Sequence, residues 1–119
     1  MKNFKELKVW QKSHQLTLAV YQITKKFPRE ELFGLTGQLR RASASIPANI
    51  AEGCGRKGEA DFARFLQIAA GSASELEYHV LLSYEIGLLE IDDYNKLAGS
   101  VSEVKRMLTV FIRKLRAES

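Results

Sequence analysis

Apolar residues recur at helical spacing in the first part of the chain. Between Leu7 and Phe27 they do not alternate with polar residues, and at about 100° per residue they fill a broad arc, with the polar residues confined to the remaining strip. An arc of about half the circumference is wider than the apolar stripe of an ordinary surface helix. We therefore predict a helix that contacts both its own bundle and a second subunit. Pro28 is expected to end it, because the residue before a proline disfavours helical geometry.

The second apolar pattern runs from Leu32 in three- and four-residue steps and ends at Gly53. Pro47 lies inside this pattern. An interior proline removes one backbone hydrogen bond and crowds the carbonyl four residues earlier, here that of Ser43, at a cost of about 3 kcal/mol. We therefore predict a helix that is kinked near Pro47, with nearby serines helping to satisfy the freed backbone groups.

Two longer helical patterns complete the chain. One begins near Glu59, and the other, from Leu97 to Leu115, has the alternating four- and three-residue steps of a heptad seam. Asp92 or Asp93 is expected to cap the last helix. No segment has a convincing strand pattern. The sequence thus predicts an all-α fold, an up-down-up-down four-helix bundle that forms a single domain over residues 1–119.

The stretch GCGRKG, from Gly53 to Gly58, has the glycine spacing of dinucleotide-binding loops. Such a site requires a strand before the first glycine, whereas here a helical pattern precedes it. Glu59 and Asp61 would also put carboxylates at the helix start where a phosphate would bind. We interpret the stretch as a turn between helices, in which Gly53 ends the second helix in a left-handed cap.

Small residues occupy the centre of the third helical pattern. The stretch AAGSAS runs from Ala69 to Ser74 and includes Gly71, which costs about 1 kcal/mol relative to alanine in helix propensity. Because small side chains let another backbone approach, this stretch predicts the closest helix crossing in the bundle.

Composition and charge limit the classes of function. The net charge is +4, but residues 1–28 and 105–119 are basic, whereas residues 59–104 carry nine acids against Arg64 and Lys96. This asymmetry suits a polyanionic partner or subunits whose opposite charges face one another. A single cysteine, Cys54, excludes an internal disulfide and fits a reducing cytoplasm. No apolar run approaches the roughly 20 residues of a membrane helix.

Candidate catalytic and metal-binding residues are few. The only histidines are His14 and His79. Glu75 and His79 are four residues apart and could share a ligand, but two ligands do not make a metal site. We therefore expect no metal, no cofactor and no enzymatic activity.

Several stretches of the chain are similar to a known family. These are SASIPANIAEGCGR, FLQIAAGSASELE, and an opening helix with Trp10, Val20, Tyr21, Phe27 and Pro28 in order. Over about residues 4–115 the chain resembles the bacterial four-helix-bundle proteins first noticed as reading frames within intervening sequences of 23S rRNA genes. This resemblance implies a ring-shaped homopentamer, similar to the accessory variability determinant of diversity-generating retroelements. In that relative a basic surface engages nucleic acid and a reverse transcriptase.

The matching motif also suggests a group of polar residues between the second and third helices. If the short turn folds these helices antiparallel, Asn49 and Glu52 lie near Ser72 and Glu75. We interpret the four residues as a structural network, because buried polar groups need partners. A binding pocket for a small molecule or an RNA base is the alternative.

Two functional hypotheses follow. In the first, the protein binds RNA or DNA, mainly through phosphates, because no cluster of aromatic and basic residues typical of base recognition is present. In the second, it is an adaptor that recruits a protein partner and has no nucleic-acid affinity of its own. The candidate phosphate-binding residues are Lys8, Lys12, Lys26, Arg40, Arg41, Arg56, Lys57, Arg113, Lys114 and Arg116.

Overall fold

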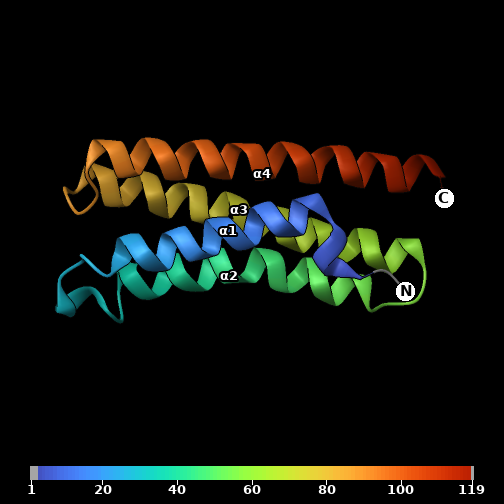
Figure 1. Ribbon diagram of the computed structural model, residues 1–119, viewed down its shortest axis with the longest axis horizontal. Coiled ribbons are helices and arrows are strands. Elements are labelled where there is room, and N and C mark those ends of the chain that lie inside the picture. Colours follow the sequence, from blue (N-terminus) through green and yellow to red (C-terminus); the bar gives the residue numbers. More distant parts are fainter. Residues whose placement is uncertain (1–2, 119) are drawn as a thin grey trace.

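The computed structural model describes residues 3–118, and these residues form four α-helices and no strand (Figure 1). The helices are α1 (Lys8–Thr24), α2 (Leu35–Cys54), α3 (Glu59–Glu85) and α4 (Ile91–Glu118), with short 3-10 helices η1 (Phe4–Glu6) and η2 (Arg29–Glu31). Successive α-helices run in opposite directions along a bundle about 46 Å long. The predicted all-α four-helix fold is confirmed.

The core lies between four pairs of neighbouring helices. α1 packs on α2, α2 on α3, α3 on α4, and α4 back on α1. The predicted apolar stripes supply the buried side chains, including the heptad seam of α4. Fully buried large residues are Leu16 and Val20 of α1, Leu39, Ile46 and Ile50 of α2, Leu66, Leu76 and Val80 of α3, and Leu97, Val101, Val104 and Leu108 of α4.

The wide apolar arc of α1 is divided between the core and the surface. Val9, Leu16 and Val20 are buried, whereas Leu18 is 57% exposed and Tyr21 is also exposed. One copy of the bundle therefore covers only part of the arc. A second subunit over the remainder stays a prediction.

The helices α1 and α2 are shorter at their connection than the sequence predicted. α1 ends at Thr24, because the amides of Lys26 and Phe27 bond to carbonyls three residues earlier and tighten the chain before Pro28. α2 begins at Leu35, whose amide donates to the Glu31 carboxylate at 3.1 Å.

The start of α4 also differs from its predicted cap. The helix begins at Ile91, so Asp92 and Asp93 lie in its first turn rather than at the cap position. Their carboxylates still favour this end, because the first turn carries the positive pole of the helix dipole.

One glycine prediction was wrong. Gly53 is not a left-handed cap: it lies inside α2, and a Cβ there would come within 2.8 Å of the Phe62 ring, so glycine permits the close approach of α3. The left-handed residue of the turn is Gly58, with φ of 87°. Gly71 is exposed, and a Cβ at this position would meet nothing within 4 Å, so no close contact requires glycine there. A closest helix crossing at Ala69–Ser74 stays a prediction.

Pro47 lies in the middle of α2, and the helix runs through it without interruption. The carbonyl of Ser43, which loses its helical N–H partner to the proline, accepts a hydrogen bond of 2.9 Å from Thr17 Oγ1 of α1, whose single proton it shares with the Ser13 carbonyl at 3.0 Å. Thr17 and Ser43 are both buried. The predicted help from serines is replaced by a threonine from the neighbouring helix, and the kink itself stays a prediction.

We expect Thr17→Val to lower the free energy of unfolding by about 1–3 kcal/mol, because the buried Ser43 carbonyl loses the side-chain donor that it has among the described residues. In a Pro47→Ala background residue 47 regains its N–H and can bond to Ser43, so the same substitution should cost clearly less. Urea denaturation of the four proteins of this double-mutant cycle measures the difference. An equal cost in both backgrounds would contradict the assignment.

Candidate nucleic-acid interface

The two ends of the bundle carry opposite charges. At one end lie the α2–α3 turn and the last turns of α4, and at the other lie the α1–α2 and α3–α4 connections (Figure 1). We name the first the basic end, with Arg56, Lys57, Arg64, Arg113, Lys114 and Arg116 against Glu52, Glu59, Asp61 and Glu118. We name the second the acidic end, with Glu30, Glu31, Glu85, Glu90, Asp92 and Asp93 against Lys25, Lys26 and Arg29.

Two arginines of the basic end are oriented by an aromatic ring. The guanidinium groups of Arg56 and Arg64 lie 4.8 and 4.6 Å from the centre of the Phe65 ring. Each also pairs with a nearby carboxylate, Arg56 with Glu52 at 3.4 Å and Arg64 with Asp61 at 3.1 Å. Such exposed pairs contribute only about 0–1 kcal/mol each, so a phosphate can compete for both guanidinium groups.

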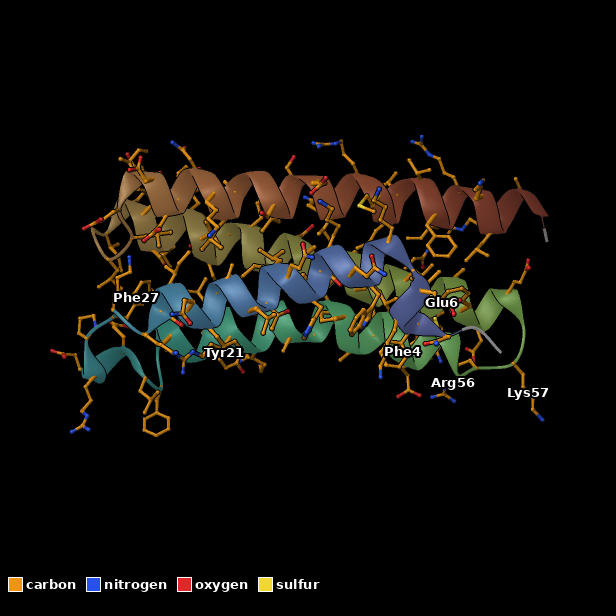
Figure 2. The ribbon with its side chains drawn as sticks, viewed as in Figure 1. Phe4, Glu6, Tyr21, Phe27, Arg56 and Lys57 are labelled. Atoms are coloured by element: carbon orange, nitrogen blue, oxygen red, sulfur yellow. The ribbon has the colours of Figure 1, made fainter. Side chains whose placement is uncertain are left out.

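Lys57, Arg113 and Lys114 are the least engaged cations of the basic end, and Lys114 borders a groove between α1 and α4. Lys57 projects outward from the α2–α3 turn (Figure 2), and Arg113 is exposed in the last two turns of α4. Within residues 3–118 none of the three side chains forms an ion pair or side-chain hydrogen bond. Lys57 and Arg113 lie outside that groove and are therefore the best placed for phosphate contacts.

The remaining predicted lysines lie elsewhere. Lys8 begins α1 and borders a groove between α1 and α4. Lys12 pairs with Glu103 of α4 at 3.7 Å, and Lys26 pairs with Asp93 at 2.9 Å. The hydrogen bond and charge of Asp93 raise the pKa of Lys26. Lys12 thus links α1 to α4, and Lys26 links the segment after α1 to the first turn of α4.

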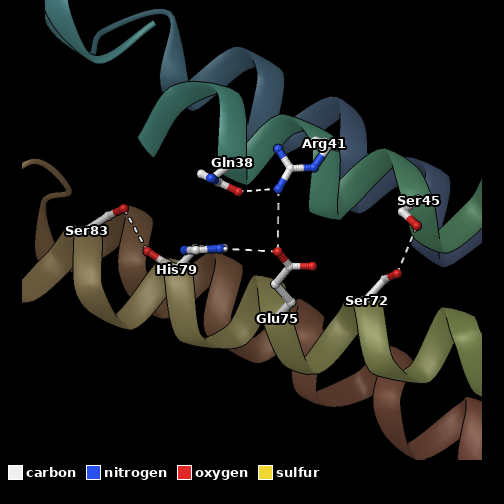
Figure 3. Close-up of polar contacts among 7 residues, drawn as sticks. All are labelled: Gln38, Arg41, Ser45, Ser72, Glu75, His79 and Ser83. Carbon is white, nitrogen blue, oxygen red and sulfur yellow. Dashed lines mark hydrogen bonds and ion pairs between the residues drawn. The ribbon is translucent and has the colours of Figure 1, made fainter. Parts of the chain in front are cut away.

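Two predicted arginines also link helices. The Arg40 side chain donates to Thr24 Oγ1 at 2.9 Å, and its guanidinium lies 4.8 Å from the Tyr21 ring centre, so it fastens α2 to α1. Arg41 donates to Gln38 and pairs with Glu75 of α3 at 3.6 Å (Figure 3).

The predicted polar network between α2 and α3 is built around a residue that the sequence did not single out. Ser45 Oγ lies 2.8 Å from Ser72 Oγ of α3 (Figure 3), and the Asn49 amide donates to the Ser45 carbonyl and hydroxyl at 2.8 and 3.0 Å. Glu52 instead pairs with Arg56, four residues later in the α2–α3 turn. The signal available in the sequence was that Ser45 lies one turn before Asn49.

His79 extends this network along α3. Its Nε2 lies 3.5 Å from Glu75, whereas its buried Nδ1 has no hydrogen-bond partner in the described structure. Among residues 3–118, no group of three or more His, Cys, Asp or Glu side chains could hold a metal ion. No helix in the described part of the chain is long and apolar enough to cross a membrane.

Sequence reasoning missed two arginines next to the predicted ones. Arg64 shares Phe65 with Arg56, and Arg106 borders both the α1–α4 groove and a second groove that contains Arg113. A signal existed for Arg106, because it lies seven residues before Arg113 and residues at that spacing share a helix face.

Comparisons with known proteins identify a matching family and a similar solved structure. Residues 5–110 match the family model described as 23S rRNA-intervening sequence protein. The fold also matches the 1.70 Å crystal structure of a protein with unknown function from the S23 ribosomal protein family of Bacteroides thetaiotaomicron. The two chains are 26% identical and superpose with a TM-score of 0.79 over 87% of this chain and 97% of the relative. No curated protein sequence matches this chain.

The pairing of Lys26 with Asp93 gives a prediction for pH dependence. A raised lysine pKa contributes stability that is present below the unfolded value of 10.5 and is lost as the pH rises through the folded value. Asp93→Asn should therefore return the Lys26 pKa toward 10.5. The variant should be slightly less stable than the wild type at lower pH, and the two should be equally stable above the raised Lys26 pKa. An NMR titration of the lysine side chains tests this, and an unchanged Lys26 titration in the variant would contradict the pairing.

Proposed function

This chain belongs to the family of 23S rRNA-intervening sequence proteins, and from that premise we propose that it is a non-enzymatic, homo-oligomeric protein that binds structured RNA or DNA through its basic end. The observation that carries the proposal is the gathering of Arg56, Lys57, Arg113, Lys114 and Arg116 at one end of the bundle, joined by Arg64. The proposed location of the protein is the cytoplasm.

The recognition would be of phosphates rather than bases. Lysine and arginine side chains on an exposed surface contact the nucleic-acid backbone, which fixes orientation but does not read sequence. The Phe65 ring is buried beneath two guanidinium groups, so it cannot stack on a base. We therefore infer a preference for shape and charge, with strong dependence on salt.

Oligomerisation is the second part of the proposal. Leu18 and Tyr21 leave an apolar area on α1 that one copy does not bury, and such areas mark interaction surfaces. A ring of five subunits, the assembly that the sequence resemblance implies, would repeat the basic end in each copy. Phosphate contacts that are weak in one subunit would then act together.

The adaptor hypothesis remains as a second candidate. It is favoured by Tyr78 and Leu81, which are exposed about one turn apart on the outer side of α3. Large apolar side chains on one exposed helix face suit the groove of a protein partner. In this case nucleic acid would be held by the partner alone.

Fluorescence anisotropy across a salt series, with a labelled structured RNA and a DNA duplex, tests the two candidates. We expect affinity to fall steeply with salt, and Lys57→Glu/Arg113→Glu to reduce the slope of log K against log salt for the duplex by about 1.8 for each subunit that contacts it, because each such subunit loses two phosphate contacts. The matched control is Lys25→Glu/Arg29→Glu, which makes the same charge change at the acidic end.

The control separates local contact from net charge. If both variants lose affinity equally, the protein attracts nucleic acid only by its overall charge, and the basic end is not the site. No binding at low salt by the purified, nucleic-acid-free protein would overturn the nucleic-acid proposal and favour the adaptor. Circular dichroism should show that both variants keep the wild-type helix content.

A further inference from the structure

The α1–α2 connection presents an apolar tip to solvent. Phe33 is 95% exposed and Leu32 beside it is 46% exposed. Their backbone is nevertheless ordered: the amides of Leu32 and Gly34 bond to the carbonyls of Arg29 and Glu31, and the Glu31 carboxylate receives the Leu35 amide. The structure thus holds an aromatic ring away from its own core in a defined position. Glu30 and Glu31 precede it in sequence and make the tip acidic.

A groove of about 600 Å³ lies on another part of the surface, between the start of α1 and the second half of α4. Its apolar residues are Leu7, Val9, Met107, Val110 and Phe111. Val110 is 59% exposed, so the groove is open to an incoming group. The charged residues that border it are Lys8, Arg106 and Lys114, and none of its lining residues is acidic.

We propose that Leu32 and Phe33 of one copy insert into the α1–α4 groove of a second copy, with Glu30 facing Lys8, Arg106 and Lys114. The proposal rests on the homo-oligomeric part of the proposed function and names its contact. The occupant is argued from complementarity, because an acidic apolar projection and a basic-rimmed apolar groove are present on the same chain. An exposed aromatic anchor that fills a pocket is also the usual centre of a protein interface.

The Leu32–Phe33 tip of one copy cannot reach the groove of the same copy. The tip lies at the acidic end, whereas the groove lies toward the end where α1 begins and α4 finishes (Figure 1). Each copy therefore offers a tip to one neighbour and a groove to another. Such a head-to-tail contact produces a closed ring, or an open chain if the rotation does not close. Lys57 and Arg113 do not line the groove, so they stay available to phosphates.

Two complementary variants test this contact by sedimentation velocity. Phe33→Ser removes the tip, and Val110→Glu places an acid in the groove without altering the core, because Val110 is largely exposed. We expect each variant alone to be monomeric at concentrations where the wild type is assembled, with association weakened at least tenfold. Phe33→Leu, which keeps an apolar side chain, should still assemble.

Mixing the two variants gives the sharper result. The Phe33→Ser copy keeps an intact groove and the Val110→Glu copy keeps an intact tip, so an equimolar mixture should form one contact and sediment as a dimer. A charge exchange adds a second test: Glu30→Arg and Arg106→Glu should each weaken assembly, and the double variant should regain part of it. Circular dichroism confirms that each variant is folded.

The outcomes separate the contact from the proposed function. A monomeric wild type would overturn both this contact and the homo-oligomer, while the anisotropy measurements would still decide nucleic-acid binding. An assembled wild type whose two variants also assemble would overturn the contact alone and leave the oligomer to other surfaces. Monomeric variants that fail to pair when mixed would overturn the head-to-tail arrangement.

Discussion

The hydrogen bond between Thr17 and the Ser43 carbonyl is the constraint on which the arrangement of the bundle depends. Pro47 leaves that carbonyl without a backbone donor in the middle of α2, at a fully buried position where water cannot replace it. Thr17 of α1 must therefore lie beside Ser43 of α2, which fixes the position of α1 along the axis of α2. Arg40, which donates to Thr24, repeats the connection about two turns further along α1. These two hydrogen bonds fix how α1 is rotated about its axis and how far it is shifted along α2. They thereby also fix the position of the α1–α4 groove.

The polar contacts between α2 and α3 act in the same way on the other side of α2. An apolar seam alone tolerates sliding, because its contacts lack direction, whereas the bonds from Ser45 to Ser72 and from Arg41 to Glu75 require one register. The close approach at Gly53, where a Cβ would meet Phe62, adds a steric limit near the turn. Together they hold Phe65 under Arg56 and Arg64 and so determine where the guanidinium groups point.

The sequence predicted what depends on local pattern and missed what depends on how helices are rotated against one another. The four helices and the α4 seam follow from apolar spacing, which one element carries by itself. The partners of Ser43, Lys26 and Arg41 lie on other helices, 26, 67 and 34 positions away in the chain, and no local pattern names them. The sequence also did not predict that Phe33 is exposed. Its apolar neighbours have the spacing of a helix start, and that spacing does not say whether the side chain packs on another helix. The ten candidate cations could likewise be named from the sequence, but not divided into those that link helices and those that face solvent.

The separation of cations that make protein contacts from cations that face solvent explains how one small bundle could both assemble and bind a polyanion. Cations that join subunits must be neutralised by carboxylates, and cations that bind phosphate must be left open, so one continuous basic surface would serve both tasks poorly. In this chain Lys8, Arg106 and Lys114 border an apolar groove, whereas Lys57 and Arg113 lie outside it. If acidic tips fill the grooves, assembly neutralises Lys8, Arg106 and Lys114 and leaves Lys57 and Arg113 open at the repeated basic ends. The affinity for a phosphate backbone would then come from the number of subunits that it can touch at once, which is a property of the assembly and not of any single site.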